Sequence, residues 1–155
     1  STPRRAEHAR ECGGKEIVSL GGMGLEEVPK KSNVYCVGSD KKVVKEFKID
    51  GVKTAGGIIG PIMGVSGLLI GLGKKRGMNG ASLLVETYGH PTYLGIKEAR
   101  ELLKILNTKF KLKLDMAALD KEVKSIEKEI KEKVEKIINL QEMKEKKKGV
   151  TNYIG

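Results

Sequence analysis

The sequence predicts an α/β protein in which strands alternate with helices around a largely parallel sheet. The best strand, Ala81–Thr87, is apolar in its centre, as expected of a strand that is covered on both faces. It is followed by Ile96–Leu106, in which apolar residues recur on one face of a helix. Strands and helices that alternate in this way are typical of layered α/β folds. The chain has 155 residues, 39% of them hydrophobic, which predicts one domain with a core.

The first fifty residues predict short elements separated by glycines. Arg4–Cys12 contains good helix formers and is followed by Gly13-Gly14, a common signal for the end of a helix. Lys15–Leu20 predicts a short buried strand that enters a glycine loop at Gly21–Gly24. A second strand and a short helix are expected at Val34–Gly38 and Lys41–Phe47.

An uncharged run of twenty residues, Thr54–Gly73, is long enough to span a bilayer as a helix. Seven of its residues are glycine, and Pro61 interrupts it, so its summed insertion energy is poor. We favour a glycine-rich turn at Ala55–Gly60 and a wholly buried helix from Pro61, where proline suits the first turn. No membrane association is therefore expected.

The segment from Met116 to about Lys148 predicts a long helix with a narrow apolar stripe. Apolar residues recur at steps of three and four between charged ones, a pattern that packs against a partner helix in the same fold or in another subunit. Residues 1–148 are expected to form one domain, and residues 149–155 a flexible tail. The expected oligomer interface consists of Leu119, Val123, Ile126, Ile130, Val134 and Ile137.

The net charge of +10 fits a polyanion partner, an acidic protein surface or simple solubility. The basic clusters lack the interleaved aromatic residues of a stacking platform, so nucleic-acid binding is not expected. Cys12 and Cys36 are too few for a disulfide framework, and no cluster of Cys and His residues predicts a metal site. We expect a protein of the reducing cytoplasm.

Two glycine motifs partly match nucleotide-binding loops. Gly21–Gly24 follows a strand, but Glu27 stands where a dinucleotide fingerprint needs glycine, and Pro29 interrupts the helix that should follow. A tight strand-to-loop turn with positive φ explains the same glycines. Gly73-Lys74 resembles the end of a phosphate-binding loop, yet Lys75 replaces the required Ser or Thr. No cofactor is therefore expected.

The candidate pocket lies at the end of the best strand, where open α/β sheets usually place ligand-binding groups. It consists of Glu86, Thr87, Tyr88 and His90. His90 could act as a general base with Glu86 as its charge partner, but no nucleophile or set of metal ligands accompanies them. Loop hydrogen bonding or contact with a partner is the favoured interpretation, and no catalytic residue is expected.

Several segments, spread in order along the whole chain, share their glycine pattern with one family. They are Leu20-Gly21-Gly22-Met23-Gly24, Gly57-Ile58-Ile59-Gly60, Gly67–Gly73, Arg76-Gly77, Leu84-Val85-Glu86-Thr87-Tyr88-Gly89 and Tyr153-Ile154-Gly155. Together they resemble the archaeal PAC2 family, the homologues of proteasome assembly chaperones.

The resemblance implies a three-layer α/β/α fold similar to that of nucleoside phosphorylases, usually without their active site. It also implies homo-oligomers that bind proteasome core-particle α subunits, as chaperones or activators rather than as enzymes. Members of the family are longer at the N-terminus, so this chain is expected to lack an N-terminal part. An enzyme that resembles ATP-grasp ligases and a self-assembling scaffold remain the alternatives.

The resemblance further implies a role for the end of the chain. Docking tails of this functional class end in a hydrophobic residue, a penultimate tyrosine and any final residue. Here Tyr153 is third from the end, so the fit is imperfect. Tyr153, Ile154 and Gly155 are the expected partner-binding residues, with the terminal carboxylate as a further contact.

Overall fold

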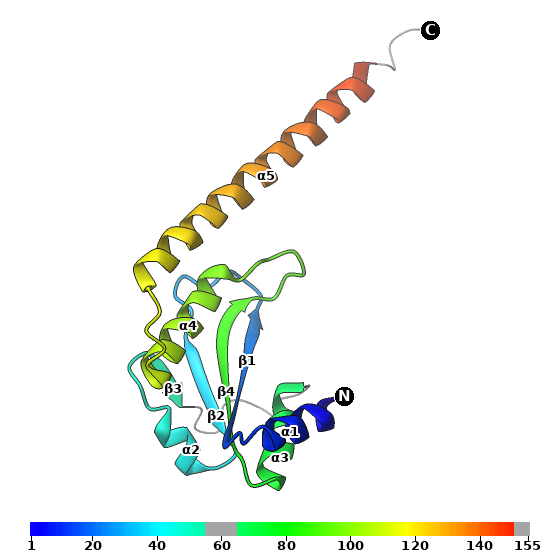
Figure 1. Ribbon diagram of the computed structural model, residues 1–155. Coiled ribbons are helices and arrows are strands. Elements are labelled where there is room, and N and C mark those ends of the chain that lie inside the picture. Colours follow the sequence, from blue (N-terminus) through cyan, green and yellow to red (C-terminus); the bar gives the residue numbers. More distant parts are fainter. Residues whose placement is uncertain (55–64, 151–155) are drawn as a thin grey trace. The chain divides into compact units, whose positions relative to one another are not determined.

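The structure of the protein is a computed structural model, and it describes residues 1–54 and 65–150 (Figure 1). The chain divides into two compact units, Ser1–Leu114 and Asp115–Gly155. The first unit holds the sheet, and the second is formed by the long helix α5 (Met116–Val150).

The sheet of the first unit has four described strands, in the order β1-β4-β2-β3. Two pairings, β1 with β4 and β2 with β3, are parallel, and an antiparallel pairing of β2 with β4 joins them. The prediction of an α/β fold with a largely parallel sheet is confirmed, although the antiparallel join was not foreseen. The strands are β1 (Glu16–Leu25), β2 (Val34–Gly38), β3 (Val52–Thr54) and β4 (Asn79–Tyr88).

Helices cover both faces of this sheet and complete the three layers (Figure 1). On one face, α3 (Val65–Lys75) packs against β1 and β4, and α1 (Thr2–Glu11) packs against α3. On the other face, α4 (Ile96–Phe110) packs against β4, and α2 (Lys41–Glu46) packs against β2 and β4. Strand β4 therefore lies between helices on both sides, which explains its apolar centre.

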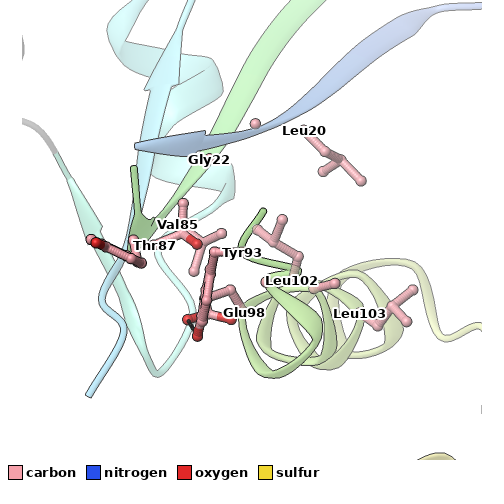
Figure 2. Close-up of a pocket in the computed structure, with 12 residues that line it drawn as sticks. Leu20, Gly22, Val85, Thr87, Tyr93, Glu98, Leu102 and Leu103 are labelled. Carbon is pink, nitrogen blue, oxygen red and sulfur yellow. Dashed lines mark hydrogen bonds between the residues drawn. The ribbon is translucent and has the colours of Figure 1, made fainter. Parts of the chain in front are cut away.

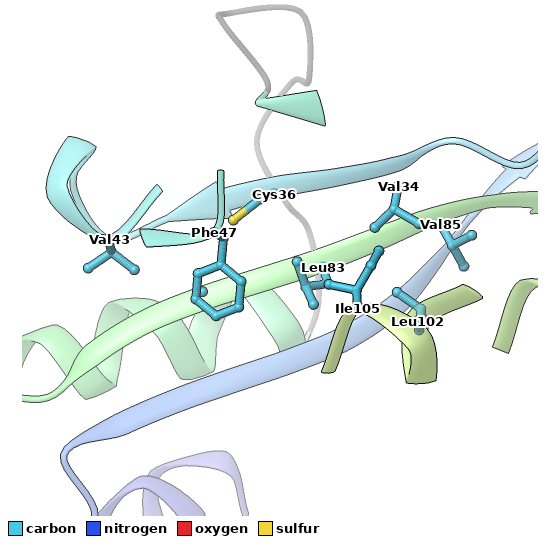
Figure 3. Packing of buried hydrophobic residues seen from close by; sticks show 9 residues of the cluster. Val34, Cys36, Val43, Phe47, Leu83, Val85, Leu102 and Ile105 are labelled. Carbon is cyan, nitrogen blue, oxygen red and sulfur yellow. The ribbon is translucent and has the colours of Figure 1, made fainter. Parts of the chain in front are cut away.

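The hydrophobic core lies between the sheet and the layer of α2 and α4 (Figure 3). Phe47 and Leu83 are its largest fully buried side chains. Alternate residues of β4 point into it because successive side chains of a strand face opposite sides. The core cluster comprises Val34, Cys36, Val43, Phe47, Ala81, Leu83, Val85, Leu102 and Ile105.

Local signals explain where several elements begin and end. The Asp40 carboxylate accepts hydrogen bonds from the backbone N–H groups of Lys42 and Val43, both at 3.0 Å, and so caps the start of α2. Helix α1 ends before Gly13, whose φ of 77° lies in the left-handed region that glycine tolerates. Helix α4 ends at Lys111, which adopts the left-handed conformation itself. The end of α1 before Gly13 matches the helix end predicted from the sequence.

The predicted glycine loop at Gly21–Gly24 is wrong. Strand β1 continues through these residues to Leu25, and the described glycines with positive φ are Gly13, Gly51 and Gly77 instead. The glycines of β1 serve close packing, because a Cβ on Gly24 would lie 3.1 Å from the Cα of Gly89. Neither a tight turn nor a phosphate-binding loop exists at this position.

The prediction of a wholly buried helix after Pro61 is also wrong. The described helix α3 begins at Val65, and its Leu68 side chain is 51% exposed whereas Ile70 is buried. The helix is apolar all round, but only one face meets β1 and β4. The expected turn at Ala55–Gly60 lies outside the described residues. Among those that are described, no helix combines the length and the apolar character of a membrane span.

Other differences concern smaller features. Strand β3 was not predicted, and α5 extends to Val150, two residues past the expected end of the helix at Lys148. The apolar spacing over Ile96–Leu106 predicts one face made of Ile96, Ala99, Leu102, Leu103 and Leu106. In the structure Ala99 is exposed, and Ile105, outside that set, is buried in the core. The burial pattern of α4 therefore follows Glu98, Leu102 and Ile105, and this stripe positions the site described next.

Candidate functional site

Glu86 forms the centre of a polar cluster near the end of β4. Its carboxylate accepts hydrogen bonds from the backbone N–H of Asn33 at 3.0 Å and from the Asn33 side-chain amide at 2.6 Å. The Tyr35 hydroxyl donates a third bond at 3.0 Å. Because β2 runs antiparallel beside β4, the segment that enters β2 meets the end of β4 at this point.

The hydrogen bonds of this cluster change the acidity of its members. Burial alone raises the pKa of Glu86, but the donors on Asn33 and Tyr35, together with the charge of Lys53, outweigh burial and lower it. The pKa of Tyr35 is raised, first by its hydrogen bond to Glu86 and then by burial. Glu86 is thus held as an ionised, fully engaged acceptor, which suits a structural role.

A cavity of about 570 Å³ lies between the sheet and α4 (Figure 2). Its floor is formed by the middle of β1 and the carboxyl end of β4, and its wall by the first turns of α4 and the loop before them. Most of the lining is apolar. The residues that line it are Leu20, Gly21, Gly22, Val85, Thr87, Tyr88, Tyr93, Gly95, Glu98, Ala99, Leu102 and Leu103.

Glu98 is the one acidic residue of this lining, and only 3% of it is exposed. The Tyr93 hydroxyl donates a hydrogen bond of 3.0 Å to its Oε1 atom. Its Oε2 atom is shielded from solvent and has no hydrogen-bond partner among the described residues. Glu98 is the third residue of α4, so the positive end of the helix dipole favours its negative charge.

Two glycines allow close packing around Thr87 at the edge of this cavity. A Cβ on Gly95 would lie 3.0 Å from Thr87 Oγ1 and 3.3 Å from Glu98 Oε2, so the backbone of Gly95 packs closely against both oxygen atoms. A Cβ on Gly22 would lie 2.9 Å from Thr87 Cγ2. Gly21 and Gly22, two glycines of the motif that looked like a loop, therefore form part of the cavity floor.

The four residues of the expected pocket are placed in three different environments. Thr87 and Tyr88 line the cavity. Glu86 belongs to the cluster with Asn33 and Tyr35 and is absent from the lining. His90 lies in the following loop, where its ring stacks on Tyr88 with 5.5 Å between ring centroids and its Nδ1 contacts Thr92 Oγ1 at 2.8 Å. The structure thus does not bring His90 and Glu86 together as an acid and base pair.

Sequence reasoning missed Glu98 and Tyr93. A signal for Glu98 was present, because it precedes Leu102 by four residues and Ile105 by seven, the spacing of one helical face. A carboxylate on the buried face of a helix indicates either a partner or a function. No comparable signal marks Tyr93, whose role depends on how the loop folds over the start of α4.

Helix α5 carries the expected oligomer stripe, and none of its five residues with described side chains is buried. Ile126 is 40% and Val134 49% exposed, and Leu119, Val123 and Ile130 are partly exposed. The side chain of Ile137 lies outside the described residues, as do Tyr153, Ile154 and Gly155 of the expected partner-binding tail. An unburied apolar seam on a helix of 35 residues is the pattern of a surface that pairs with another helix.

The site contains groups that can recognise a bound molecule. Within residues 1–54 and 65–150, no group of three His, Cys, Asp or Glu side chains is arranged to hold a metal ion. The cavity combines apolar walls with one carboxylate, one threonine hydroxyl and two tyrosines. Such a set can orient a bound molecule through a few polar contacts.

Comparison with known proteins identifies the fold family. The sequence profile of the PAC2 family matches residues 5–134. The chain belongs to the PAC2 family. Among proteins with curated functional descriptions, no sequence matches this PAC2 chain significantly.

Solved structures of other PAC2-like proteins match the fold. Pyrococcus furiosus PbaA, an archaeal homologue of proteasome-assembly chaperone, matches 99% of this chain and 62% of its own, with a TM-score of 0.74 and 24% identity. Pyrococcus furiosus PbaB, an archaeal proteasome activator, matches 86% of this chain and 56% of its own, with a TM-score of 0.72 and 32% identity. A PAC2 family protein from Streptomyces avermitilis matches with a TM-score of 0.64 and 18% identity, over 84% of this chain and 55% of its own. This PAC2 chain therefore spans less than two thirds of each of these relatives.

Proposed function

We propose that this PAC2 protein is a non-enzymatic binding protein of the proteasome core particle, acting in the cytoplasm as a chaperone or activator. The observation that carries the proposal is the similarity to PbaB, which is described as an archaeal proteasome activator and shares 32% identity over 86% of this chain. The fold that this chain shares with PbaA supports the same proposal. The described cavity adds apolar walls with a few polar groups, which fits a binding protein.

The proposal includes self-association through α5. Ile126 and Val134 belong to a stripe of apolar residues that recur at steps of three and four, and both are substantially exposed. An exposed seam of this length is stabilised when two or more helices pack knobs into holes. Each chain of such an oligomer would present its own surface to the core particle, which raises avidity when several sites are engaged together.

The proposal also includes a contact between the tail and the α subunits of the core particle. Tyr153 and Ile154 supply two apolar anchors, and the carboxylate of Gly155 supplies a charge. Capture of a terminal carboxylate together with apolar anchors is a recurrent mode of peptide recognition. The support for this contact comes from the sequence alone.

The test is light scattering after size exclusion, with the purified protein alone and then mixed with archaeal core particle or its free α subunits. We expect a homo-oligomer that co-elutes with one or both. Elution as a single chain that ignores both partners contradicts the proposal.

Three variants separate self-association through α5 from binding by the tail. Ile126→Glu places a charge in the apolar stripe and should dissociate the oligomer, whereas Lys128→Glu, at a position whose side chain is 79% exposed, should leave it intact. Deletion of Tyr153–Gly155 should weaken binding to the core particle without changing the oligomer. If the tail-less protein binds as tightly as the full chain, the tail contact is wrong while the binding role stands.

The absence of enzyme activity is tested by ligand-linked stability. A ligand that binds only the native state must raise the melting temperature. We expect no shift with ATP and magnesium at millimolar concentration, and a clear shift would favour the ligase alternative.

A further inference from the structure

We propose that the cavity between the sheet and α4 binds a small organic cation, with an amidinium or guanidinium group paired to Glu98 and an apolar body against the cavity walls. This inference concerns a ligand and goes beyond the proposed binding of the proteasome. It does not depend on that role, so either can fail alone.

The carboxylate of Glu98 lacks one of its hydrogen-bond partners among the described residues. Glu98 is 3% exposed, and among the described residues only its Oε1 atom has a partner, the Tyr93 hydroxyl. Oε2 is shielded from solvent without a donor from any described residue. A buried acceptor that lacks a hydrogen bond destabilises the protein, and a buried charge does so more strongly. A bound donor would remove this penalty.

The residues around Glu98 indicate that its missing partner is positively charged. The described lining contains no Lys, Arg or His, so the cavity itself offers no cation to Glu98. The start of α4 favours a negative charge at this position, and its N-cap residue, Gly95, has no side chain that could pair with it. A positively charged donor from outside the chain is therefore the complementary group.

The size and the walls of the cavity also fit such a ligand. A volume of about 570 Å³ suits a small molecule, and Leu20, Val85 and Leu102 give it apolar walls. Thr87 Oγ1 and Glu98 Oε2 both lie close to Gly95, so two acceptors stand near each other on this wall of the cavity. A planar group with several N–H donors matches converging acceptors better than a single ammonium does.

The experiment is an NMR titration of the full chain with benzamidine as the probe. Benzamide, which has the same ring and an uncharged head, is the control. We expect saturable shifts of the backbone signals of Thr87, Tyr93 and Glu98 with benzamidine, and affinity at least about tenfold weaker for benzamide, because hydrogen bonds to charged groups are the stronger ones. Equal binding of the two probes, or no saturable shift, overturns the proposal.

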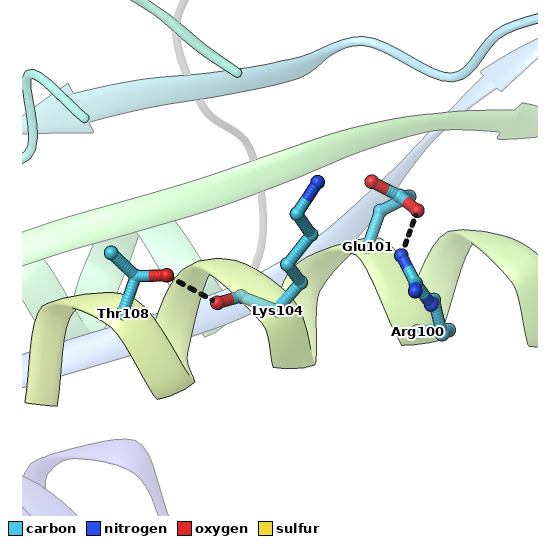
Figure 4. Close-up of polar contacts among 4 residues, drawn as sticks. All are labelled: Arg100, Glu101, Lys104 and Thr108. Atoms are coloured by element: carbon cyan, nitrogen blue, oxygen red, sulfur yellow. Dashed lines mark hydrogen bonds and ion pairs between the residues drawn. The ribbon is translucent and has the colours of Figure 1, made fainter. Parts of the chain in front are cut away.

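Matched variants test the role of the carboxylate. Glu98→Gln keeps the shape and removes the charge, and we expect it to weaken benzamidine binding by about tenfold or more. Glu101→Gln removes the same charge three residues later in α4, where the side chain is 39% exposed and pairs with Arg100 at 2.8 Å (Figure 4). Glu101→Gln should bind like the parent protein. Unchanged binding by Glu98→Gln contradicts the inference.

A second pair keeps the test informative if Glu98→Gln does not fold. Gly95→Ala fills the space beside Thr87 and Glu98 and should abolish binding, whereas Gly71→Ala, with nothing within 4 Å of the added Cβ, should not. A buried ion pair is also screened little by salt, so the benzamidine affinity should change little between low and high salt. Strong salt dependence would indicate binding at the surface and overturn the assignment.

The same guanidinium chemistry could come from an arginine side chain of a protein. A short peptide with one internal arginine is therefore titrated in parallel. If the peptide shifts the cavity signals at lower concentration than benzamidine does, the cavity is a peptide site and the small-molecule assignment is wrong. Weaker or absent binding of the peptide supports it.

Discussion

Glu86 and Glu98 are two carboxylates of the first unit with opposite hydrogen-bonding states. Glu86 accepts three hydrogen bonds from Asn33 and Tyr35, while Glu98 leaves one oxygen atom without a described donor. Fully engaged buried acceptors stabilise a fold, and incompletely engaged ones indicate a missing partner. The two residues therefore give different predictions, one for stability and one for binding.

Replacement of Glu86 by Gln should make the free energy of unfolding depend less on pH. The folded-state pKa of Glu86 lies below its ordinary value of 4.5, so its contribution is present above that pH and is lost as the pH falls through the folded-state pKa. At pH 7 we expect Glu86→Gln to lower the free energy of unfolding by about 1 kcal/mol. Urea unfolding from pH 7 to pH 3 should show the two proteins converging in acid. Glu27→Gln, at an exposed position, is the control and should match the parent protein throughout.

The two cysteines should differ in reactivity. Burial raises the pKa of the Cys36 thiol to about 11 from 9.0, with a smaller opposing effect of Lys109, and Cys36 belongs to the core. Cys12 is exposed. Because the thiolate is the reactive form, we expect a disulfide reagent at pH 8 to modify one thiol rapidly in the folded protein and both in denaturant. Rapid reaction in a Cys12→Ser variant would contradict this.

At the scale of elements, glycines have different roles in the contact of α3 with the sheet. A Cβ on Gly80 would lie 2.9 Å from Ile70 Cγ2 and 3.1 Å from the Ile70 Cα, so the backbone of α3 lies directly over β4. A Cβ on Gly73 would lie 3.0 Å from Ile17 Cδ1 of β1. Gly71, on the same helix, faces open space. The close approach depends on particular glycines, not on their abundance.

A pair of alanine substitutions tests this contact. Gly80→Ala should lower the free energy of unfolding by about 1–3 kcal/mol, because backbone atoms of α3 must move. Gly71→Ala should raise it by about 0.5–1 kcal/mol, since alanine loses less entropy than glycine in a helix. Urea unfolding of both variants measures the difference. Similar effects of the two substitutions would show that the packing of α3 does not depend on Gly80.

The sequence predicted most elements because local pattern decides them. The strand Val34–Gly38 and the start of α4 at Ile96 were both expected from turn residues and apolar spacing. The antiparallel join of β2 and β4 was not, because it pairs residues far apart in the chain, such as Val34 with Val85. The exposed face of α3 was missed for a related reason, since a helix that is apolar all round gives no sign of which face is covered.

The candidate site was only partly predictable, because it also depends on how residues far apart in the chain pair. The rule that ligand groups gather at strand ends led to Thr87 and Tyr88, which do line the cavity. It also led to Glu86, whose side chain belongs to the cluster with Asn33 instead. Which face a strand residue takes depends on the register of the sheet, and register is a property of the fold.

At the scale of the whole molecule, the two units should be separable. The core cluster, from Val34 to Ile105, lies entirely within the first unit, and the oligomer stripe lies within the second. A chain that ends at Leu114 should therefore keep its cooperative unfolding and lose self-association. Calorimetry and light scattering measure the two properties. Loss of cooperative unfolding in the shortened chain would show that its stability depends on α5 or on the oligomer.

The order of the strands also bears on synthesis. In the described sheet, β4 is the only neighbour of β1 and joins it to β2, yet it is the last of the four strands in the chain. On the ribosome, β1 must therefore wait for more than fifty further residues before this parallel partner emerges. We expect nascent chains stalled before β4 to be cleaved readily by protease and those stalled well after it to resist. During that interval β1 and its glycines are open to pairing with any other strand, which makes this strand the point at which a chaperone could act on the nascent protein.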